Sequence, residues 1–443
     1  MALAAALSAV TTGCPPAPPP APPPPPAPFD TLPAADRPFL VAPLSGYPHT
    51  VDAGRRVRLE EGFAALARGE EAAAEAAATE LLADDPALHP ARVLAAQVEF
   101  VRRDPAAALA AVRPVAAAVP GYTAAELLHG RAAEAAGHVV EAFEAYRAAA
   151  PASAAAAARA AEIAPRAAEI VFHRVEDALA RGRTAAAATA VDTLRDWDPE
   201  GETTLRAERA LAVARRDPEA ELTAVARLAE RFPDDRELTE RRAELELTVG
   251  DPGAGLALYE RLAAEHPGDA TLAARLEAAK FRWRFLQLPA EVTALAGRPE
   301  LSRGGFATLL FWLAPSVRYG RGSAPRIASD ILDHPRREEI ARVVNLGLME
   351  VEPSVHLFAP DRPVSRGEAL EALLRLLGGA AGGEPRPCAA EVPLNRRPTG
   401  EFVCATAAGC GLIPSEGDCL PRAPLAGAEA LELIRRALLR LGS

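Results

Sequence analysis

The prolines of this 443-residue chain recur at a fixed spacing, and that spacing constrains the fold more than any other feature. A period of 34 residues is longer than a single helix and is typical of a helix–turn–helix unit stacked as a solenoid. A glycine or aspartate lies 16 or 17 positions before five of these prolines, which divides each unit into two helices. The prolines are Pro86 and Pro120, then Pro165, Pro199, Pro233 and Pro267, and the turn residues are Gly69, Asp104, Gly182, Asp217 and Gly250.

Small residues and one aromatic residue recur at matched positions between these markers. In LLHGRAAEAAGHVVEAFEAYRAAA, Gly130 lies on the first helix, Gly137 makes the turn and Tyr146 lies on the second helix. Tyr259 takes the position of Tyr146 in the last unit. This pattern resembles the tetratricopeptide repeat (TPR). The resemblance implies an all-α solenoid of about six units over residues 56–276, in which the aromatic side chain fills the groove between closely packed helices and proline ends the second helix.

Two further expectations follow from this repeat. The interval from Pro120 to Pro165 exceeds the period by 11 residues, so the segment near 151–165 is an insertion that lengthens a helix or a loop. In solenoids of this kind the first helices line the concave face, where an extended peptide of a partner protein would bind. Charged residues on these helices are either contacts for such a partner or only solvate an alanine-rich surface. The candidate partner contacts are Arg174, Arg206, Arg209 and Arg241.

Composition narrows the functional classes. The formal net charge is −11 and the sequence pI is about 5.4, which argues against nucleic-acid binding. The sequence has no G-x-S-x-G elbow, no H-E-x-x-H pair and no glycine-rich phosphate loop before a helix. We therefore expect a protein that is not an enzyme and that needs no cofactor or metal ion.

The first 14 residues, MALAAALSAVTTGC, form a short apolar stretch that ends at Cys14. This layout resembles a bacterial lipoprotein signal, in which the cysteine receives lipid. The alternative is a disordered alanine-rich start with an incidental cysteine. Residues 15–55 are expected to form a proline-rich linker and an extended lead-in, and polyproline II would make the linker a stiff spacer. By resemblance to enterobacterial lipoproteins, Pro15 favours the outer membrane, with the protein facing the periplasm or the cell surface.

The remaining cysteines lie close together near the C-terminus. Four cysteines in an exported protein suit two disulfides. A zinc site is the alternative, but the sequence lacks the paired C-x₂-C spacing and a nearby histidine. The four residues are Cys388, Cys404, Cys410 and Cys419.

Residues 277–443 lose the repeat phase. The segment FRWRFLQLP, from Phe281 to Pro289, either is a glycan or nucleotide platform or caps the last solenoid helix and joins it to the next domain. Farther on, SDILDHPRREEIARVVNLGLMEVEPSVHLFAPDRPVSRGEALEALLRLL resembles an S-layer homology (SLH) motif, although Pro335 replaces the usual tryptophan. Its second helix should begin at Ser365, with Glu368 completing a capping box.

Partial copies of this motif flank it on both sides. The upstream copy has Gly305 in place of the acidic residue, and the downstream copy has Gly427 in place of the arginine. Three such motifs form one three-lobed domain in the SLH family, where the motif arginine contacts an acidic group of a wall polysaccharide. The resemblance implies Arg366 and Arg303 as anion contacts, with Glu368 beside them. The alternative is a capped helix start in which Arg366 pairs with Glu368 or a neighbour.

The same alignment bears on the cysteines and on function. Cys419 takes the place of the buried Phe358, so the resemblance favours the pairs Cys388–Cys404 and Cys410–Cys419. We expect an adaptor lipoprotein of the cell envelope that binds protein partners or extended peptides and, through the SLH-like domain, cell-wall glycan. A secretin pilot or outer-membrane assembly lipoprotein is one alternative. An accessory to a carbohydrate-processing or export enzyme is another.

Overall fold

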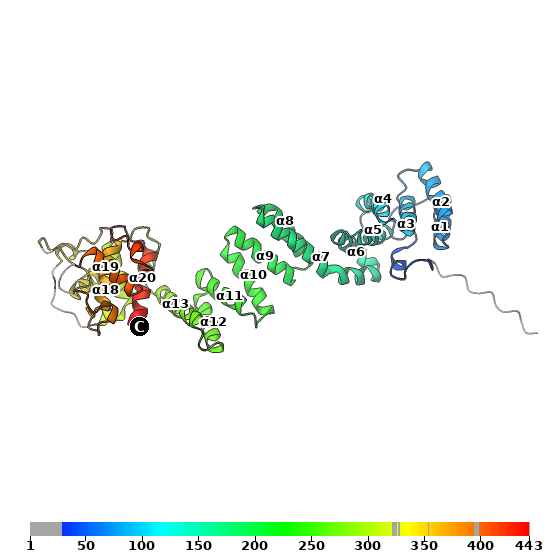
Figure 1. Ribbon diagram of the computed structural model, residues 1–443. Coiled ribbons are helices and arrows are strands. Elements are labelled where there is room, and N and C mark those ends of the chain that lie inside the picture. Colours follow the sequence, from blue (N-terminus) through cyan, green and yellow to red (C-terminus); the bar gives the residue numbers. More distant parts are fainter. Residues whose placement is uncertain (1–28, 321–325, 327, 353, 394–397, 443) are drawn as a thin grey trace, which may run out of the picture. The chain divides into compact units, whose positions relative to one another are not determined.

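The computed structural model describes residues 29–442 apart from 321–325, 327, 353 and 394–397, and within these residues all regular elements are helices (Figure 1). The chain divides into two compact units, 1–215 and 216–443. The prediction of a helical solenoid followed by a small, mostly helical region is confirmed.

The first unit consists of consecutive antiparallel helices, each packed on its neighbour in sequence. Its elements are η1 (Arg37–Phe39), α1 (Ala53–Ala67), α2 (Glu71–Asp84), α3 (His89–Val101), α4 (Pro105–Ala118), α5 (Thr123–Ala135), α6 (Val139–Ala149), η2 (Ala150–Ala152), α7 (Ala154–Ala180), α8 (Thr184–Trp197) and α9 (Glu202–Arg215).

The predicted turn residues act as expected in this unit. Gly69, Gly137 and Gly182 have φ values of +82°, +86° and +68°, the left-handed conformation that lets the chain leave a first helix without strain. Asp104 is the N-cap of α4, where its side chain accepts a hydrogen bond from Ala107 N at 2.8 Å. Local turn chemistry therefore sets the length of each helix.

Close approach of α5 and α6 explains the small residue on the first helix. A Cβ atom on Gly130 would lie 2.6 Å from the ring carbons Cδ1 and Cε1 of Tyr146, so only glycine leaves room for that ring. Tyr146 is fully buried, and burial raises the pKa of its hydroxyl. The predicted role of Tyr146 as the filler of the groove is confirmed.

The prediction for Pro165 is wrong. This proline lies inside α7, a helix of 27 residues, and does not end a second helix. The insertion starts α7 early, because Ser153 caps it by accepting a hydrogen bond from Ala156 N. Pro165 removes one hydrogen bond from an exposed position of this long helix, and the packed face on either side sustains the helix. The other five prolines follow second helices, as predicted.

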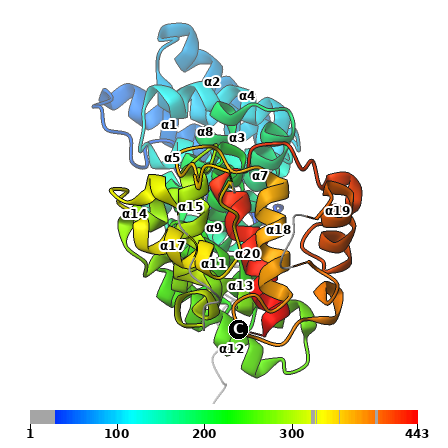
Figure 2. The ribbon, with the colours of Figure 1, turned by 90° about the vertical axis from the view of Figure 1, so that its left-hand side faces the viewer.

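The second unit begins with four solenoid helices and continues into the C-terminal region (Figure 2). Its α-helices are α10 (Pro218–Arg231), α11 (Arg236–Thr248), α12 (Pro252–Glu265), α13 (Ala270–Leu286), α14 (Ala290–Thr293), α15 (Arg303–Leu313), α16 (Pro315–Tyr319), α17 (Arg337–Asn345), α18 (Arg366–Leu377), α19 (Gly400–Gly409) and α20 (Gly427–Leu441). Short 3₁₀ turns are η3 (Ala294–Gly297), η4 (Ser329–Ile331), η5 (Pro387–Ala389) and η6 (Glu416–Asp418).

The end of α13 belongs to the core of the C-terminal region. Phe281 and Phe285 are buried in one apolar cluster with Leu295 and with residues of α15, α17, α18 and α20. Trp283, between them, remains partly exposed. The aromatic segment therefore caps the last solenoid helix and joins it to the next region, which is the second of the two roles considered for it.

A ring of three backbone hydrogen bonds holds the centre of the C-terminal region. Val364 N donates to Leu301 O at 2.9 Å, Leu425 N donates to Val364 O at 3.0 Å, and Leu301 N donates to Leu425 O at 2.8 Å. Each of these buried residues directly precedes the N-cap of α15, α18 or α20. The three motif copies thus meet at equivalent positions. Figure 2 shows α18 between α19 and α20, and both pack on it.

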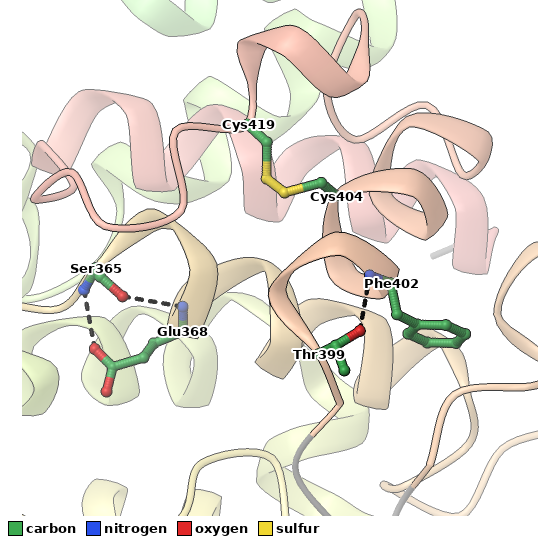
Figure 3. Close-up of a disulfide and its surroundings, with 6 residues drawn as sticks. All are labelled: Ser365, Glu368, Thr399, Phe402, Cys404 and Cys419. Carbon is green, nitrogen blue, oxygen red and sulfur yellow. Dashed lines mark hydrogen bonds between the residues drawn. A yellow bond between two sulfur atoms is a disulfide. The ribbon is translucent and has the colours of Figure 1, made fainter.

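The middle copy has the local structure that its sequence predicts. Gly347, with φ +71°, follows the C-terminus of α17, and Ser365 begins α18 with a complete capping box to Glu368 (Figure 3). Phe358 is buried, and the carboxylate of Asp330 accepts hydrogen bonds from the amides of Phe358 and Ala359. These contacts hold the loop that inserts the aromatic ring.

The four cysteines form two disulfides, but the predicted pairing is wrong. Cys388 is bonded to Cys410, with Cα atoms 5.2 Å apart, and Cys404 is bonded to Cys419, with Cα atoms 5.6 Å apart (Figure 3). Cys404 lies within α19 and Cys410 at its C-cap, six residues on, so their side chains leave the helix in different directions. Cys404 reaches the loop of Cys419, and Cys410 reaches η5.

Candidate functional site

Residues 29–47, which we call the lead-in segment, pack against the first helices of the solenoid. Leu32 and Leu40 are buried. Phe29 meets Phe63 of α1 with ring centroids 5.6 Å apart, and Phe39 meets the groove-filling Tyr146 at 5.2 Å. This part of the predicted linker and lead-in, residues 15–55, therefore packs into the folded first unit.

Three donors on the solenoid bind backbone carbonyls of the lead-in segment. The amide Nε2 of Gln97 on α3 donates to Val41 O at 2.8 Å, and Gln97 is 0% exposed. The hydroxyl of Tyr122, at the N-cap of α5, donates to Pro43 O. The amide of Ala124, also on α5, donates to Ser45 O at 3.0 Å. The backbone here is irregular, with turns closed by Ser45 N to Ala42 O and by Tyr47 N to Leu44 O, and the three contacts are made to the backbone and not to its side chains.

The carboxylate of Asp36 in this segment is bound by arginine side chains. Asp36 is 3% exposed, and its Oδ1 lies 2.7 Å from Nε and 2.5 Å from Nη2 of Arg131 on α5. Arg103 contributes a second, longer contact at 3.5 Å. A buried carboxylate held by two guanidinium nitrogens is a strong and directional arrangement.

The same arginine links the carboxylate to the aromatic contact. Nη1 of Arg131 donates to Glu134 at 3.0 Å, and Glu134 accepts a hydrogen bond from the hydroxyl of Tyr146 at 2.9 Å. Arg159 of α7 also pairs with Glu134. Burial raises the pKa of Glu134, but hydrogen bonds from Arg159 and Tyr146 and the charge of Arg131 lower it further, and the net shift is downward. Glu134 is therefore ionised at neutral pH.

The four predicted partner contacts have different surroundings. Arg206 places its Cζ atom 4.7 Å from the centroid of the Phe172 ring on α7. Arg174 lines a polar cavity of about 350 Å³ at the start of α6, and neither it nor Arg209 has an ion pair or hydrogen bond among the described residues. Arg241 lies in the second unit, where Glu221 holds its Nε and Nη2 at 2.7 Å each. These hydrogen bonds raise the pKa of Arg241 despite its partial burial, and they assign it a structural role.

The first of the predicted anion contacts is part of the interior. Arg303 is 5% exposed, and its Nε and Nη2 donate to the carbonyls of Phe358 and Glu350 at 2.8 and 2.7 Å. Its Nη1 lies 2.5 Å from Oε1 of Glu368, and its guanidinium covers the Phe358 ring at 4.6 Å. Arg303 thus ties the first copy of the motif to the second.

Arg366 makes the equivalent connection one copy further on. Its Nε lies 2.7 Å from Oε1 of Glu429, an ion pair without hydrogen-bond alignment. The alternative role, in which Arg366 pairs with a neighbour, is the one that this contact favours. Glu368 instead receives Arg303 and Arg362. Burial raises its pKa, but the Ser365 amide and the two arginines lower it further, so the net shift is downward.

The helix N-termini beside these arginines are also occupied. The amides of Arg303 and Gly304 donate to Arg362 O and Pro360 O, and those of Arg366 and Gly367 donate to Ala423 O and Pro421 O. An anion at either helix start would have to compete with these contacts. The geometry therefore gives no support to the predicted anion sites at Arg303 and Arg366.

At the third junction, between the last copy of the motif and the first, both members of the arginine–glutamate pair are missing. Gly427 occupies the arginine position and Gly305 the acidic position. A Cβ atom on Gly427 would lie 1.9 Å from Leu295 O, because η3 packs directly against the start of α20. Gly305 and Gly427 therefore lie at the same junction, the one against which η3 packs after the end of the solenoid.

A cavity of about 410 Å³ lies beside this junction, between α13 and α20. Phe281, Phe285 and Leu431 form much of its wall, and its charged residues are Arg282, Arg435 and Glu432. Glu432 pairs with Arg435 at 2.7 Å, so the lining offers neither a nucleophile nor a free acid–base pair. In the described part of the chain, no cluster of acidic, histidine and cysteine residues could hold a metal ion, and no helix has the length and apolarity to cross a membrane.

Solved structures that match this chain include tetratricopeptide repeat proteins. A tetratricopeptide repeat protein from Parabacteroides merdae superposes with a TM-score of 0.21 at 14% identity, over 55% of this chain and 97% of that chain. The TPR domain of P58(IPK) gives a TM-score of 0.27 at 16% identity, over 87% and 93% of the two chains. A thermophilic TPR protein from Thermus thermophilus, TTC0263, gives 0.18 at 18% identity, over 51% and 98%. No family model and no curated protein matches the sequence.

Sequence analysis missed Asp36, Gln97 and Tyr122 as site residues. The signal was weak, because the apolar residues between the proline tract and the first helix show neither helical nor strand periodicity, and nothing sets Asp36 apart from Asp30 in the same stretch.

Proposed function

We propose that this protein is a non-catalytic adaptor of the bacterial cell envelope, which binds extended segments of partner proteins along the first helices of its solenoid. One observation carries the proposal. The surface formed by α1, α3, α5 and α6 already holds a segment of the same chain, built of turns and the 3₁₀ helix η1, through three backbone acceptors, a carboxylate and an aromatic ring. A surface with these donors suits a peptide ligand.

We further propose attachment to the outer membrane through lipid on Cys14, with the protein facing the periplasm or the cell surface. The support is the apolar stretch that ends at this cysteine and the proline tract after it, both of which lie outside the described residues. Paired cysteines suit an oxidising compartment such as the periplasm. The secretin-pilot and assembly-factor alternatives share this anchor and differ from the adaptor only in the partner.

Binding of cell-wall glycan through the C-terminal region has less support. The motif resemblance favours it, whereas the internal contacts of Arg303 and Arg366 oppose it. The third alternative, an accessory to an enzyme with a site where the solenoid joins the C-terminal region, has the α13–α20 cavity as its candidate surface.

The adaptor proposal is tested by crosslinking and mass spectrometry in the native envelope. Wild type should give crosslinks to partner proteins from the first helices, and the Arg174→Glu/Arg209→Glu variant should lose them. A matched control is Arg261→Glu, on the second helix α12, whose contact with Glu265 is exposed. Unchanged crosslinks in the double variant, or crosslinks from the C-terminal region alone, contradict the proposal. The Cys14→Ser variant should leave the membrane fraction and lose labelling by an alkyne fatty acid.

A further inference from the structure

We propose that the lead-in segment is a displaceable resident ligand, and that its groove accepts in trans a partner segment with an acidic residue followed three positions later by an aromatic one. The inference rests on the proposed peptide-binding function and specifies which segment that function recognises. In the chain itself these two residues are Asp36 and Phe39.

The acidic residue is required because the groove provides a buried cation. Arg131 places two nitrogens within 2.7 Å of the carboxylate of Asp36, and Arg103 adds positive charge on the other side. Without an anion the Arg131 guanidinium would keep only Glu134 as a charged partner. A neutral side chain at this position would therefore leave a half-buried cation poorly satisfied, which selects for a carboxylate.

The aromatic residue is required by the surface next to that cation. The ring of Phe39 packs on the ring of Tyr146, and both are buried. The hydroxyl of Tyr146 bonds to Glu134, which is itself bonded to Arg131. The two specific contacts therefore share one network, so a ligand that supplies both gains more than the two contacts taken separately.

The remaining contacts are independent of sequence. Gln97 and Tyr122 donate to carbonyl oxygens that a segment with the same backbone course would present at the same place, whatever its side chains. These donors fix the course of the ligand backbone and leave selection to the acidic and aromatic positions.

Two features favour displacement of the segment. Its apolar residues Val41, Leu44 and Tyr47 are only partly buried, and ordering its backbone opposes binding. Its advantage is the covalent link, which gives an effective concentration on the order of millimolar. A partner segment that binds more tightly, or is presented in several copies, can overcome this.

The test uses the full-length chain and a fluorescein-labelled peptide of residues 29–47. In the Asp36→Ala/Phe39→Ala variant the resident segment is weakened and the helices are unchanged. Fluorescence anisotropy should show the peptide binding at least ~10-fold more tightly to this variant than to wild type, because the tethered competitor has been weakened. A peptide with the same two alanines should not bind.

A groove substitution separates the site from the rest of the surface. Adding Arg131→Met to the double variant should abolish peptide binding. Adding Arg113→Met should leave it unchanged, because Arg113 is exposed and pairs with Glu141 away from the segment. Circular dichroism verifies that each variant keeps its helices.

Equal peptide affinity in wild type and in a folded double variant overturns the proposal. If the double variant does not fold, hydrogen exchange of the wild-type protein tests instead whether the segment detaches from a folded first unit. The amides of Phe39 and Leu40 should exchange faster than those of α5, and exchange of both only by unfolding of the whole first unit would show the segment to be a permanent part of the fold. Either result leaves the adaptor function open, since crosslinks from α7 and α9 test that function independently.

Discussion

The two ion pairs that join the motif copies allow a matched test of how burial sets their energies. Arg303–Glu368 and Arg366–Glu429 occupy equivalent positions, but their side chains are 7% and 14% exposed in the first pair and 27% and 33% in the second. We expect Glu368→Gln to destabilise the C-terminal region far more than Glu429→Gln, although both replace one carboxylate by an isosteric amide.

The size of each destabilisation follows from the contacts that the arginine keeps after its glutamate is replaced. Breaking a buried pair leaves an uncompensated charge and costs about 3–5 kcal/mol. Arg303 still keeps the carbonyls of Phe358 and Glu350, so we take the lower end, about 3 kcal/mol. Arg366 and Glu429 are partly solvated and lack hydrogen-bond alignment, so their loss should cost about 0.5–1 kcal/mol.

Hydrogen exchange measured by mass spectrometry on peptides of α15 and α18 reports this region without interference from the solenoid. A difference of about 2 kcal/mol between the variants corresponds to roughly 30-fold in exchange rate. A double-mutant cycle with Arg303→Met should recover a coupling of similar size. Equal exchange rates in the two variants would show that burial does not set these energies and would refute the reasoning.

The pH dependence supplies an independent check of the buried pair. The pKa of Glu368 is lower in the folded protein than in the unfolded chain. The stabilisation is therefore complete above the unfolded-state pKa, near the ordinary value for glutamate, and is lost as the pH falls through the folded pKa. The stability difference between wild type and Glu368→Gln should shrink below about pH 4. A difference that grows on acidification would contradict this sign.

Two further predictions concern close packing and crosslinks. Gly130→Ala should lower the stability of the first unit in thermal unfolding by about 1–3 kcal/mol, because the new methyl group would lie 2.6 Å from the ring of Tyr146. Gly54→Ala in α1 is the control: its methyl group would meet only Asp52 Oδ1, at 3.4 Å, and the change should be neutral or slightly stabilising. Non-reducing peptide mapping should recover Cys388 linked to Cys410 and Cys404 linked to Cys419, and each loop, of 22 and 15 residues, should contribute about 3 kcal/mol. Recovery of Cys388 linked to Cys404 would contradict the structure.

The elements that sequence reasoning predicted correctly are those decided within one turn of the chain. Gly137 ends a first helix because a left-handed residue is needed there, and Ser365 begins α18 because its hydroxyl and Glu368 satisfy free amides. The position of Gly130 opposite Tyr146 follows from the repeat itself. Pro165 was misplaced because the insertion lets α7 begin at Ala154, so a proline that keeps the 34-residue interval to Pro199 lies inside a helix and not after one.

The site depended on contacts that no local pattern encodes. Asp36 and Arg131 lie 95 positions apart, and the lead-in segment has no periodicity to mark it as folded. The cysteine pairing depended on the face of α19 from which each side chain leaves. The alignment of Cys419 with the buried Phe358 indicated that Cys419 takes part in a disulfide, but not that its partner is Cys404. Arg303 and Arg366 were recognised as special residues, but the acceptors that hold them come from neighbouring copies of the motif.

The glycines at the third junction limit how this chain can be divided. Two junctions of the ring are closed by arginine–glutamate pairs of the C-terminal copies themselves, whereas at the third η3 packs against Gly427, and Phe281 and Phe285 of α13 complete the core beside it. A fragment that starts after α13 would lose Phe281 and Phe285 and expose the core around Leu295 and Leu310. The C-terminal region is therefore not a portable module, and any fragment or chimaera must carry the last solenoid helix with it.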